Sequence, residues 1–218
     1  PQWEERDRLI LSIGHTAPVL YATLAEAGFY PKDETLTLRK FGSRLQGHPS
    51  RDFKLPGVET SAGSLGQGLG IAIGMALSAK MDDKNYRTYC VMGDGELQEG
   101  SVWEAAMAAS NYRLDNLCAI IDRNKLQIDG STENVMALEP LAEKWSSFGW
   151  NVVEIDGHDH NDIIDAFAIA RATIGQPTLV LANTVMGKGV KSIENDNKWH
   201  GKVPSKDDLD KFLNELYC

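Results

Sequence analysis

Four short apolar runs alternate with helix-like stretches along this chain, and this alternation limits the folds open to it. The runs consist mainly of aliphatic, aromatic and β-branched side chains, as is typical of parallel strands buried on both faces. They cover residues 89–92, 117–121, 151–155 and 178–182. This order of elements predicts an α/β fold: a doubly wound parallel sheet with helices on both faces.

The stretches between the runs are expected to be crossover helices and functional loops. Helices are predicted over residues 67–79, 102–111 and 162–172, with Asn161 or Asp162 as the N-cap of the third. Ligands of such sheets bind at the carboxyl ends of strands, which draws attention to the loops after Met92 and Ile121. The segments 41–64 and 185–205 lack a clear period and are rich in Gly, Pro, His and Asn, so we expect ordered functional loops or lids.

Charge and cysteine content argue against several classes of protein. The 218 residues have a formal net charge of −9 and no cluster of Lys and Arg, so no nucleic-acid partner is expected. No stretch reaches about eighteen uninterrupted apolar residues, so no membrane span is expected. The three cysteines, Cys90, Cys118 and Cys218, form no C-x-x-C pair, which favours a reducing cytoplasmic location and, for Cys90 and Cys118, a place in the core.

A glycine-bracketed aspartate after the first run is the strongest local motif. Gly93 and Gly95 allow a sharp turn and close approach of a ligand, and Asp94 offers a hard oxygen at the mouth of the sheet. Alone, such a motif more often marks an Asp that only stabilises its own turn. Asn124 follows the next run, and with a loop carbonyl the two side chains could hold Mg²⁺ or Ca²⁺ bound to phosphate. An acidic protein needs such a local device to bind a diphosphate.

The spacing of these residues resembles the thiamine diphosphate fingerprint, in which G-D-G precedes an Asn by some thirty residues. Residues 7–15, 55–59, 63–68 and 93–100 are each similar to segments of transketolase, in the same order. The similarity extends over nearly the whole chain, which is identified as a member of that family. It implies that residues 1–218 form a single thiamine diphosphate-binding (PP) domain of an enzyme that transfers a two-carbon ketol unit between sugar phosphates.

The resemblance assigns roles to individual positions. The implied metal ligands are Asp94, Asn124 and the main-chain oxygen of Leu126. The implied cofactor-binding residues are Gly63, Leu65, Gly93, Gly95, Asn124, Ile128, His15 and His200. The implied catalytic residues are His15, His48, His200 and Glu99. In the family, histidines at these positions contact diphosphate or substrate hydroxyls and move protons, which suits neutral imidazoles.

Other charged or polar positions keep a simpler interpretation beside the functional one. Glu99 and Glu104 match glutamates that link the two cofactor sites of family members, although the helix dipole alone favours a carboxylate in a first turn. His158 and His160 are interpreted as residues of a loop and a helix start. The glycine run 63–70 resembles a dinucleotide-binding loop, but residues 59–62 form a poor strand and the next strand ends in G-D-G, so a nicotinamide or flavin site is not favoured.

The resemblance also implies a partner. In the family, a glutamate that acts on the aminopyrimidine and arginines that bind the sugar phosphate lie in a pyrimidine-binding domain, which is absent here together with the C-terminal domain. We expect a C-terminal transketolase subunit to supply them, giving a heterotetramer, and we expect an N-terminal segment to be missing before Pro1. The loop 63–68, the helix after Gly95 and Glu99 would lie at the interface, where the small residues 105–109 allow close helix contact or instead form a monomer core.

Three functions stay open at this point. The favoured one is the cofactor-binding subunit of a split transketolase. The second is part of a related thiamine enzyme, either deoxyxylulose-phosphate synthase or a specialised ketolase, and the third is a non-catalytic scaffold subunit. Intact metal and histidine positions argue against the third. The sugar phosphate used is left open, because its phosphate end would be bound by the partner.

Overall fold

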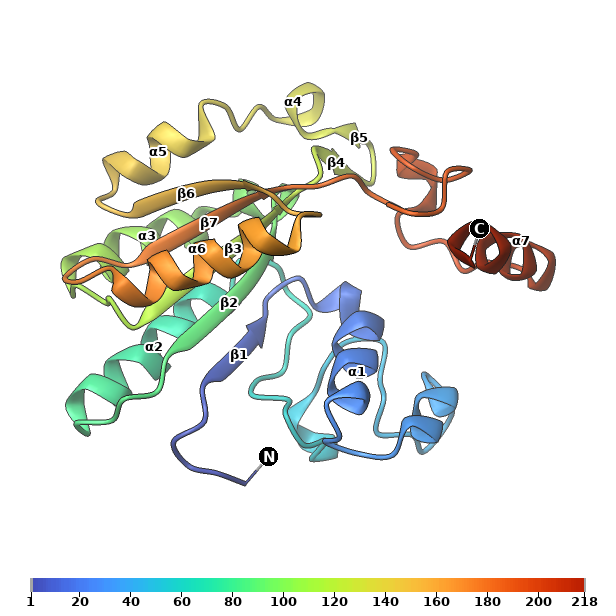
Figure 1. The fold of residues 1–218 in the computed structure, drawn as a ribbon, viewed down its shortest axis with the longest axis horizontal. Coiled ribbons are helices and arrows are strands. Elements are labelled where there is room, and N and C mark those ends of the chain that lie inside the picture. Colours follow the sequence, from blue (N-terminus) through green and yellow to red (C-terminus); the bar gives the residue numbers. More distant parts are fainter. Residues whose placement is uncertain (1, 218) are drawn as a thin grey trace.

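The computed structural model describes residues 2–217 and contains a five-stranded sheet in the order β1-β2-β3-β7-β6 (Figure 1). All neighbouring strands in it are parallel. The strands are β1 (Arg8–Leu11), β2 (Thr88–Gly93), β3 (Leu117–Arg123), β6 (Asn151–Asp156) and β7 (Thr178–Asn183), and a small hairpin adds β4 (Leu126–Gln127) and β5 (Gly130–Ser131). The predicted α/β fold and its four strands are confirmed. β1 was not predicted, because four residues are too few to show a period.

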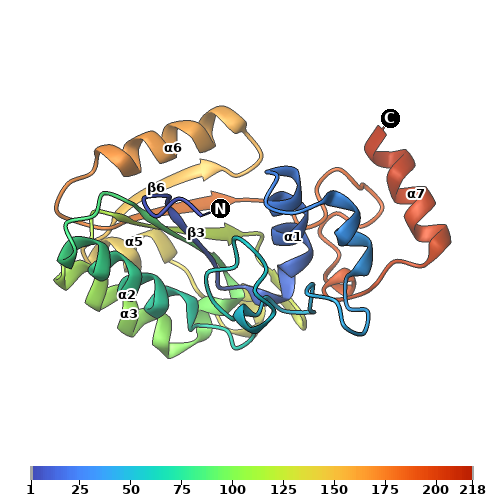
Figure 2. The same cartoon turned by 90° about the horizontal axis from the view of Figure 1, so that it is seen from below.

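Helices cover both faces of the sheet, as expected. The helices are α1 (Ala17–Glu26), α2 (Gly68–Met81), α3 (Gly100–Asn111), α4 (Thr132–Val135), α5 (Leu141–Ser147), α6 (His160–Ala172) and α7 (Lys206–Tyr217). Figure 2 shows α6 on one face and α2, α3 and α5 on the other. The predicted N-cap of α6 is wrong: the helix begins two residues earlier, and the Asp159 carboxylate accepts hydrogen bonds from the N–H groups of Asn161 and Asp162.

Side chains of the central strands alternate between two hydrophobic clusters, because successive residues of a strand point to opposite faces. On β3, Ala119 and Ile121 pack in the large cluster beneath α2, α3 and α5. Cys118, one residue away, packs with Ala166 of α6 on the other face. Cys90 and Cys118 are buried free thiols, which confirms their assignment to the core, and burial raises the pKa of Cys118 to about 12. Cys218 lies outside the described residues.

The remaining elements gather beyond the carboxyl ends of the strands (Figure 1). α1 packs with Leu45 and Leu55 in a third cluster that includes Leu11 and Ile13 at the end of β1. Within segments 41–64 and 185–205 the only helices are the short 3-10 turns Arg51–Phe53 and Asn197–Trp199, so both are loops as predicted. None of the helices between residues 2 and 217 is long and apolar enough to cross a membrane.

Candidate active site

The two predicted metal-binding segments lie side by side at the ends of neighbouring strands. Gly93 on β2 is paired with Asp122 on β3, and the Asp94 N–H donates to the Asp122 carbonyl at 3.2 Å. Asn124 is two residues further along the chain. Parallel pairing therefore brings the G-D-G turn and Asn124 to one edge of the sheet, where the sequence predicted a ligand site.

The Asp94 carboxylate is almost fully buried and is held in one orientation. Its Oδ1 accepts from the Gly95 N–H at 2.8 Å, and its Oδ2 accepts from the Lys125 N–H at 2.6 Å and from Arg123 Nη1 at 3.0 Å. An ionised carboxylate has about four acceptor positions, so these bonds leave room for a further bond to a cation. Burial raises the pKa of Asp94, although the Lys125 N–H and Arg123 act in the opposite direction.

Arg123 is a functional candidate that the sequence analysis missed. Its guanidinium is buried, and it donates through Nη1 to Asp94 and Thr132 and through Nη2 to Glu133 at 3.0 Å and Glu139 at 2.7 Å. Burial alone would lower the pKa of Arg123, but the hydrogen bonds to Glu139, Asp94 and Glu133 raise it. Arg123 thus keeps a positive charge beside the buried Asp94. Its position at the end of an apolar run indicated a place at the edge of the sheet but gave no sign that its side chain would be buried.

The other two implied metal ligands follow β3 closely: Asn124 comes directly after the strand, and Leu126 is the first residue of β4. Asn124 Oδ1 accepts from the Leu126 N–H at 2.9 Å and retains a second lone pair. Within residues 2–217 no group of three or more His, Cys, Asp or Glu side chains could hold a metal ion. A cation site here would therefore combine one carboxylate with an amide and a carbonyl oxygen. These are the hard oxygen ligands that Mg²⁺ and Ca²⁺ prefer, so the residues present fit a diphosphate-bound cation.

The G-D-G turn leaves little room for side chains at its two glycines. A Cβ at Gly95 would lie 3.3 Å from Gln127 Cβ, so a side chain at this position would require Gln127 to shift. Ile128, implied to pack against the cofactor, is 67% exposed, and Leu65 is half-buried. The Ile128 carbonyl accepts from Asn197 Nδ2 at 2.9 Å, which ties this turn to the 185–205 loop.

The site contains a second buried carboxylate, Glu96, directly after the G-D-G turn. The sequence analysis did not predict it. Glu96 accepts hydrogen bonds from Ser12 Oγ and from the Gly66 N–H through Oε1, and from the Gly93 N–H through Oε2. Burial raises the pKa of Glu96, partly offset by these hydrogen bonds. Within G-D-G-E, a buried glutamate cannot be distinguished by sequence from a solvated one, so nothing in the pattern singled it out.

Three of the five histidines come together, and they are those that the resemblance implied. The rings of His15 and His200 lie 5.1 Å apart between centroids, with an angle of 41° between their planes. A Cβ at Gly63 would lie 3.9 Å from His48 Cγ, so His48 borders the loop 63–68, called the glycine loop below. Burial of its ring lowers the pKa of His15 most, and the nearby His200 and His48 lower it further. The cluster therefore favours a neutral imidazole at His15, which can accept a proton.

Glu99 and Glu104 are both exposed, and they lie on or next to α3. Glu99 is the N-cap residue of α3 without a side-chain capping bond, and it lies against Gly66, whose Cβ would be 2.7 Å from Glu99 Cβ. Of the small residues 105–109, Ala105, Ala106 and Ala109 are buried in the large cluster beside α2. Of the two interpretations left open for residues 105–109, the monomer core therefore holds for these three alanines, which pack beside α2, whereas Met107 is 58% exposed.

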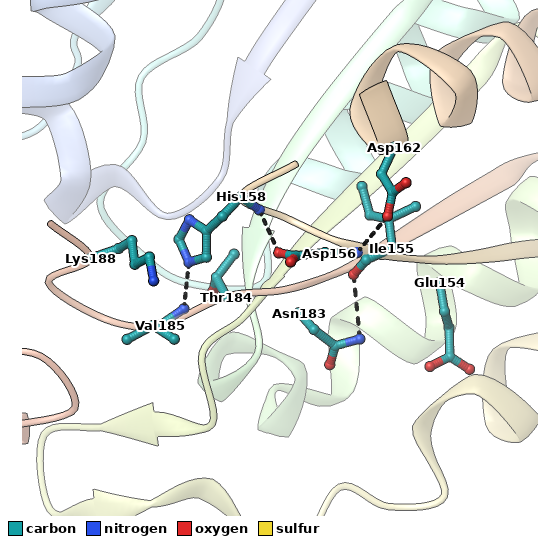
Figure 3. A pocket seen from close by; sticks show the side chains of 9 residues that line it. All are labelled: Glu154, Ile155, Asp156, His158, Asp162, Asn183, Thr184, Val185 and Lys188. Atoms are coloured by element: carbon teal, nitrogen blue, oxygen red, sulfur yellow. Dashed lines mark hydrogen bonds between the residues drawn. The ribbon is translucent and has the colours of Figure 1, made fainter. Parts of the chain in front are cut away.

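A cleft of about 560 Å³ lies at the ends of β6 and β7 (Figure 3). None of the implied site residues lines it. His158 Nε2 accepts from the Val185 N–H at 2.8 Å, and the His158 N–H donates to Asp156 Oδ1 at 2.8 Å (Figure 3). His158 therefore connects the loop before α6 to the start of the 185–205 loop. His160 is the first residue of α6, as interpreted from the sequence.

Fold and site together define a parallel α/β domain that presents hard oxygen ligands, glycine turns and paired imidazoles at the carboxyl edge of its sheet. Residues 1–216 match the family model described as "Transketolase, thiamine diphosphate binding domain". The chain belongs to the transketolase family and corresponds to its thiamine diphosphate-binding domain. The predicted resemblance is confirmed.

Similar proteins fall into two groups by length. The chain is 47% identical over 216 residues to a subunit of the apulose-4-phosphate transketolase of Phocaeicola vulgatus, covering 99% of the chain and 76% of that protein. It is 44% identical over 218 residues to human transketolase, of which it covers 34%. The structure of transketolase from Leishmania mexicana superposes with a TM-score of 0.91 at 34% identity, over 99% of this chain and 34% of that one. The chain thus spans about a third of the long transketolases and three quarters of the Phocaeicola protein.

Proposed function

We propose that this chain is the cofactor-binding subunit of a heteromeric transketolase, active only with a partner that carries the pyrimidine-binding domain. The observation that carries the proposal is that Asp94 and Asn124 directly follow two paired neighbouring strands, β2 and β3, in a chain that also brings His15 and His200 into ring contact. When bound, thiamine diphosphate supplies the electron sink that allows a carbon–carbon bond to break and form. The cation would be Mg²⁺, or Ca²⁺ in its place.

Each implied residue has a defined task in this proposal. Asp94, Asn124 and the Leu126 carbonyl would hold the cation that neutralises the diphosphate, and the backbone at Gly93 and Gly95 allows its close approach. His15, His48 and His200 would donate hydrogen bonds to diphosphate or substrate oxygens and move protons of sugar hydroxyls. Gly63, Leu65 and Ile128 would line the cofactor.

The exposed surface of α2 and α3 has features that favour contact with a partner chain. Gly70 and Gly74 on α2 are exposed, with nothing within 4 Å of where their Cβ atoms would be. A helical glycine costs about 0.5–1 kcal/mol relative to alanine, and close approach of another backbone is a reason to tolerate that cost. Glu99, Glu104 and Met107 are exposed on and beside the neighbouring α3. We propose that this surface contacts the partner in an assembly of two copies of each chain.

The substrate is proposed to be a ketose with an anionic group at its far end. The relatives named for their substrates are apulose-4-phosphate transketolase subunits and a 6-deoxy-6-sulfo-D-fructose transketolase subunit of a Clostridium species, 46% identical over 194 residues. One of these names contains a phosphate and the other a sulfonate. A specialised ketolase is therefore the second candidate.

The test is ketol transfer measured with and without the partner. The chain is expected to be inactive alone and active in the complex recovered from its native source, with a ketose phosphate as donor and an aldose phosphate as acceptor. Parallel assays with a sulfonated ketose distinguish the two candidates. Full transfer activity of the isolated chain would contradict the requirement for a partner.

A further inference from the structure

The glycine loop and the G-D-G turn, which would hold opposite ends of the cofactor, are joined through one buried side chain. Glu96 is 2% exposed, and its two oxygens accept from three groups on separate segments. Oε1 accepts from Ser12 Oγ at the end of β1 and from the Gly66 N–H at 2.8 Å, and Oε2 accepts from the Gly93 N–H at the end of β2 at 3.2 Å. Ser12 Oγ in turn accepts from the Gly68 N–H at 3.1 Å.

The side chains of Glu96 and Ser12 hold the glycine loop by accepting hydrogen bonds from two backbone N–H groups. Among the described residues, the N–H groups of Gly66 and Gly68 bond to Glu96 and Ser12. The loop also fits closely: Gly66 has φ +79°, and a Cβ at Gly68 would collide with Ser12. Ser101 Oγ also donates to the Gly66 carbonyl at 3.1 Å, but the buried Gly66 N–H bonds to the Glu96 carboxylate. Since unpaired buried N–H groups are costly, the Glu96 carboxylate helps to fix the position of the loop.

We infer that Glu96 is a positioning residue that fixes the 63–68 loop relative to the Gly93–Gly95 turn, so that one carboxylate orders the binding surfaces for both ends of thiamine diphosphate. The inference rests on the proposed cofactor site and adds a residue to it. Because Glu96 is buried, it would touch neither cofactor nor substrate. It acts through the Gly66 and Gly93 amides.

The chemistry of the side chain makes a conservative substitution informative. A carboxylate accepts at both oxygens, whereas the amide of Glu96→Gln has one accepting oxygen and one donating NH₂ group. With three donors aimed at the position, the amide must place its NH₂ group against either the Gly66 or the Gly93 N–H. The variant has nearly the same size, so it disturbs hydrogen bonding more than packing.

The experiment compares wild type, Glu96→Gln and Glu143→Gln, a matched change at an exposed position on α5. Amide hydrogen exchange measured on the chain is expected to accelerate at Gly66 and Gly93 in Glu96→Gln only. In the complex with the partner subunit, the KM for thiamine diphosphate at fixed Mg²⁺ is expected to rise about 10–100-fold, as for outer-shell partners of metal ligands. The kcat at saturating cofactor should change much less, because no reacting group is altered.

The outcomes separate this inference from the proposed function. If wild type and Glu143→Gln fail to bind thiamine diphosphate, the proposed function is wrong, whatever the exchange data show. If they bind it and Glu96→Gln has the same KM and the same exchange at Gly66 and Gly93, the inference is wrong. Should Glu96→Gln fail to fold, Ser12→Ala tests the same connection without a change of charge. It should accelerate exchange at Gly68 and raise the KM, and an unchanged KM would overturn the inference.

Discussion

At the scale of single residues, the site depends on how buried charges are compensated. Asp94 and Arg123 are each about 2% exposed, and burial disfavours the charged form of both. Arg123 meets this cost by also bonding to Glu133 and Glu139, which are partly exposed. The Asp94 carboxylate therefore enters the site with a permanent counter-charge, and a bound cation would be a second one.

Replacing Arg123 with methionine should destabilise the chain in a way that depends on metal. Removing one partner of a buried ion pair costs about 3–5 kcal/mol. The loss should shrink at saturating Mg²⁺ with thiamine diphosphate, because the cation then offsets the charge of Asp94. Urea unfolding of Arg123→Met and wild type, with and without both ligands, measures this difference. An equal loss under both conditions would argue against a cation at Asp94.

The His15–His200 pair gives a titration that can be followed directly. Burial is the largest cause that lowers the pKa of His15, and the neighbouring His200 is the second. His200→Gln should therefore raise the pKa of His15 toward, but not up to, its ordinary value of about 6.5. NMR titration of the imidazole protons measures the change, with His160→Gln as the distant control. A His15 pKa that stays the same or falls would mean that the two rings do not interact as described.

At the scale of elements, the 185–205 loop is anchored at its start and again in its second half. His158 binds its start at Val185, Asn197 binds the Ile128 carbonyl, and Trp199 packs edge-on against Phe212 of α7 at 5.1 Å. The loop carries His200 to within ring contact of His15. Its geometry thus depends on contacts with three other elements, which a local pattern of Gly, Asn and Lys does not reveal.

Loss of the His158 anchor should affect catalysis more than stability. His158→Ala removes one acceptor at the exposed start of the loop, so the free energy of unfolding should fall by only about 0.5–1.5 kcal/mol. Amide exchange at Val185 should accelerate, and kcat/KM of the complex should decrease because His200 is held less firmly. His160→Ala, at the exposed start of α6, is the matched control. Unchanged exchange at Val185 in His158→Ala would refute the anchoring role.

At the scale of the whole molecule, the sequence predicted the strands and the site residues at their carboxyl ends. It did not predict the buried polar residues that hold the site together. The buried strands, and the location of Asp94 and Asn124 at neighbouring strand ends, follow from apolar runs whose carboxyl ends share one edge of the sheet. The roles of Glu96 and Arg123 do not follow, because a charged residue gives no sign in sequence of whether it is buried. For a related reason the sequence left two interpretations open for residues 105–109: small residues permit close packing without indicating which helix supplies it.

The central claim is that Asp94 holds the cation through which this chain binds thiamine diphosphate. Its most direct measurement is calorimetric titration of thiamine diphosphate, with Mg²⁺, into the complex of this chain with its partner. Wild type and Asp129→Ala, a change at an exposed position in the neighbouring β4–β5 turn, should bind the cofactor only when Mg²⁺ is present. Asp94→Ala, shown by circular dichroism to be folded, should lose this binding. Wild-type affinity and Mg²⁺ dependence in Asp94→Ala would contradict the account.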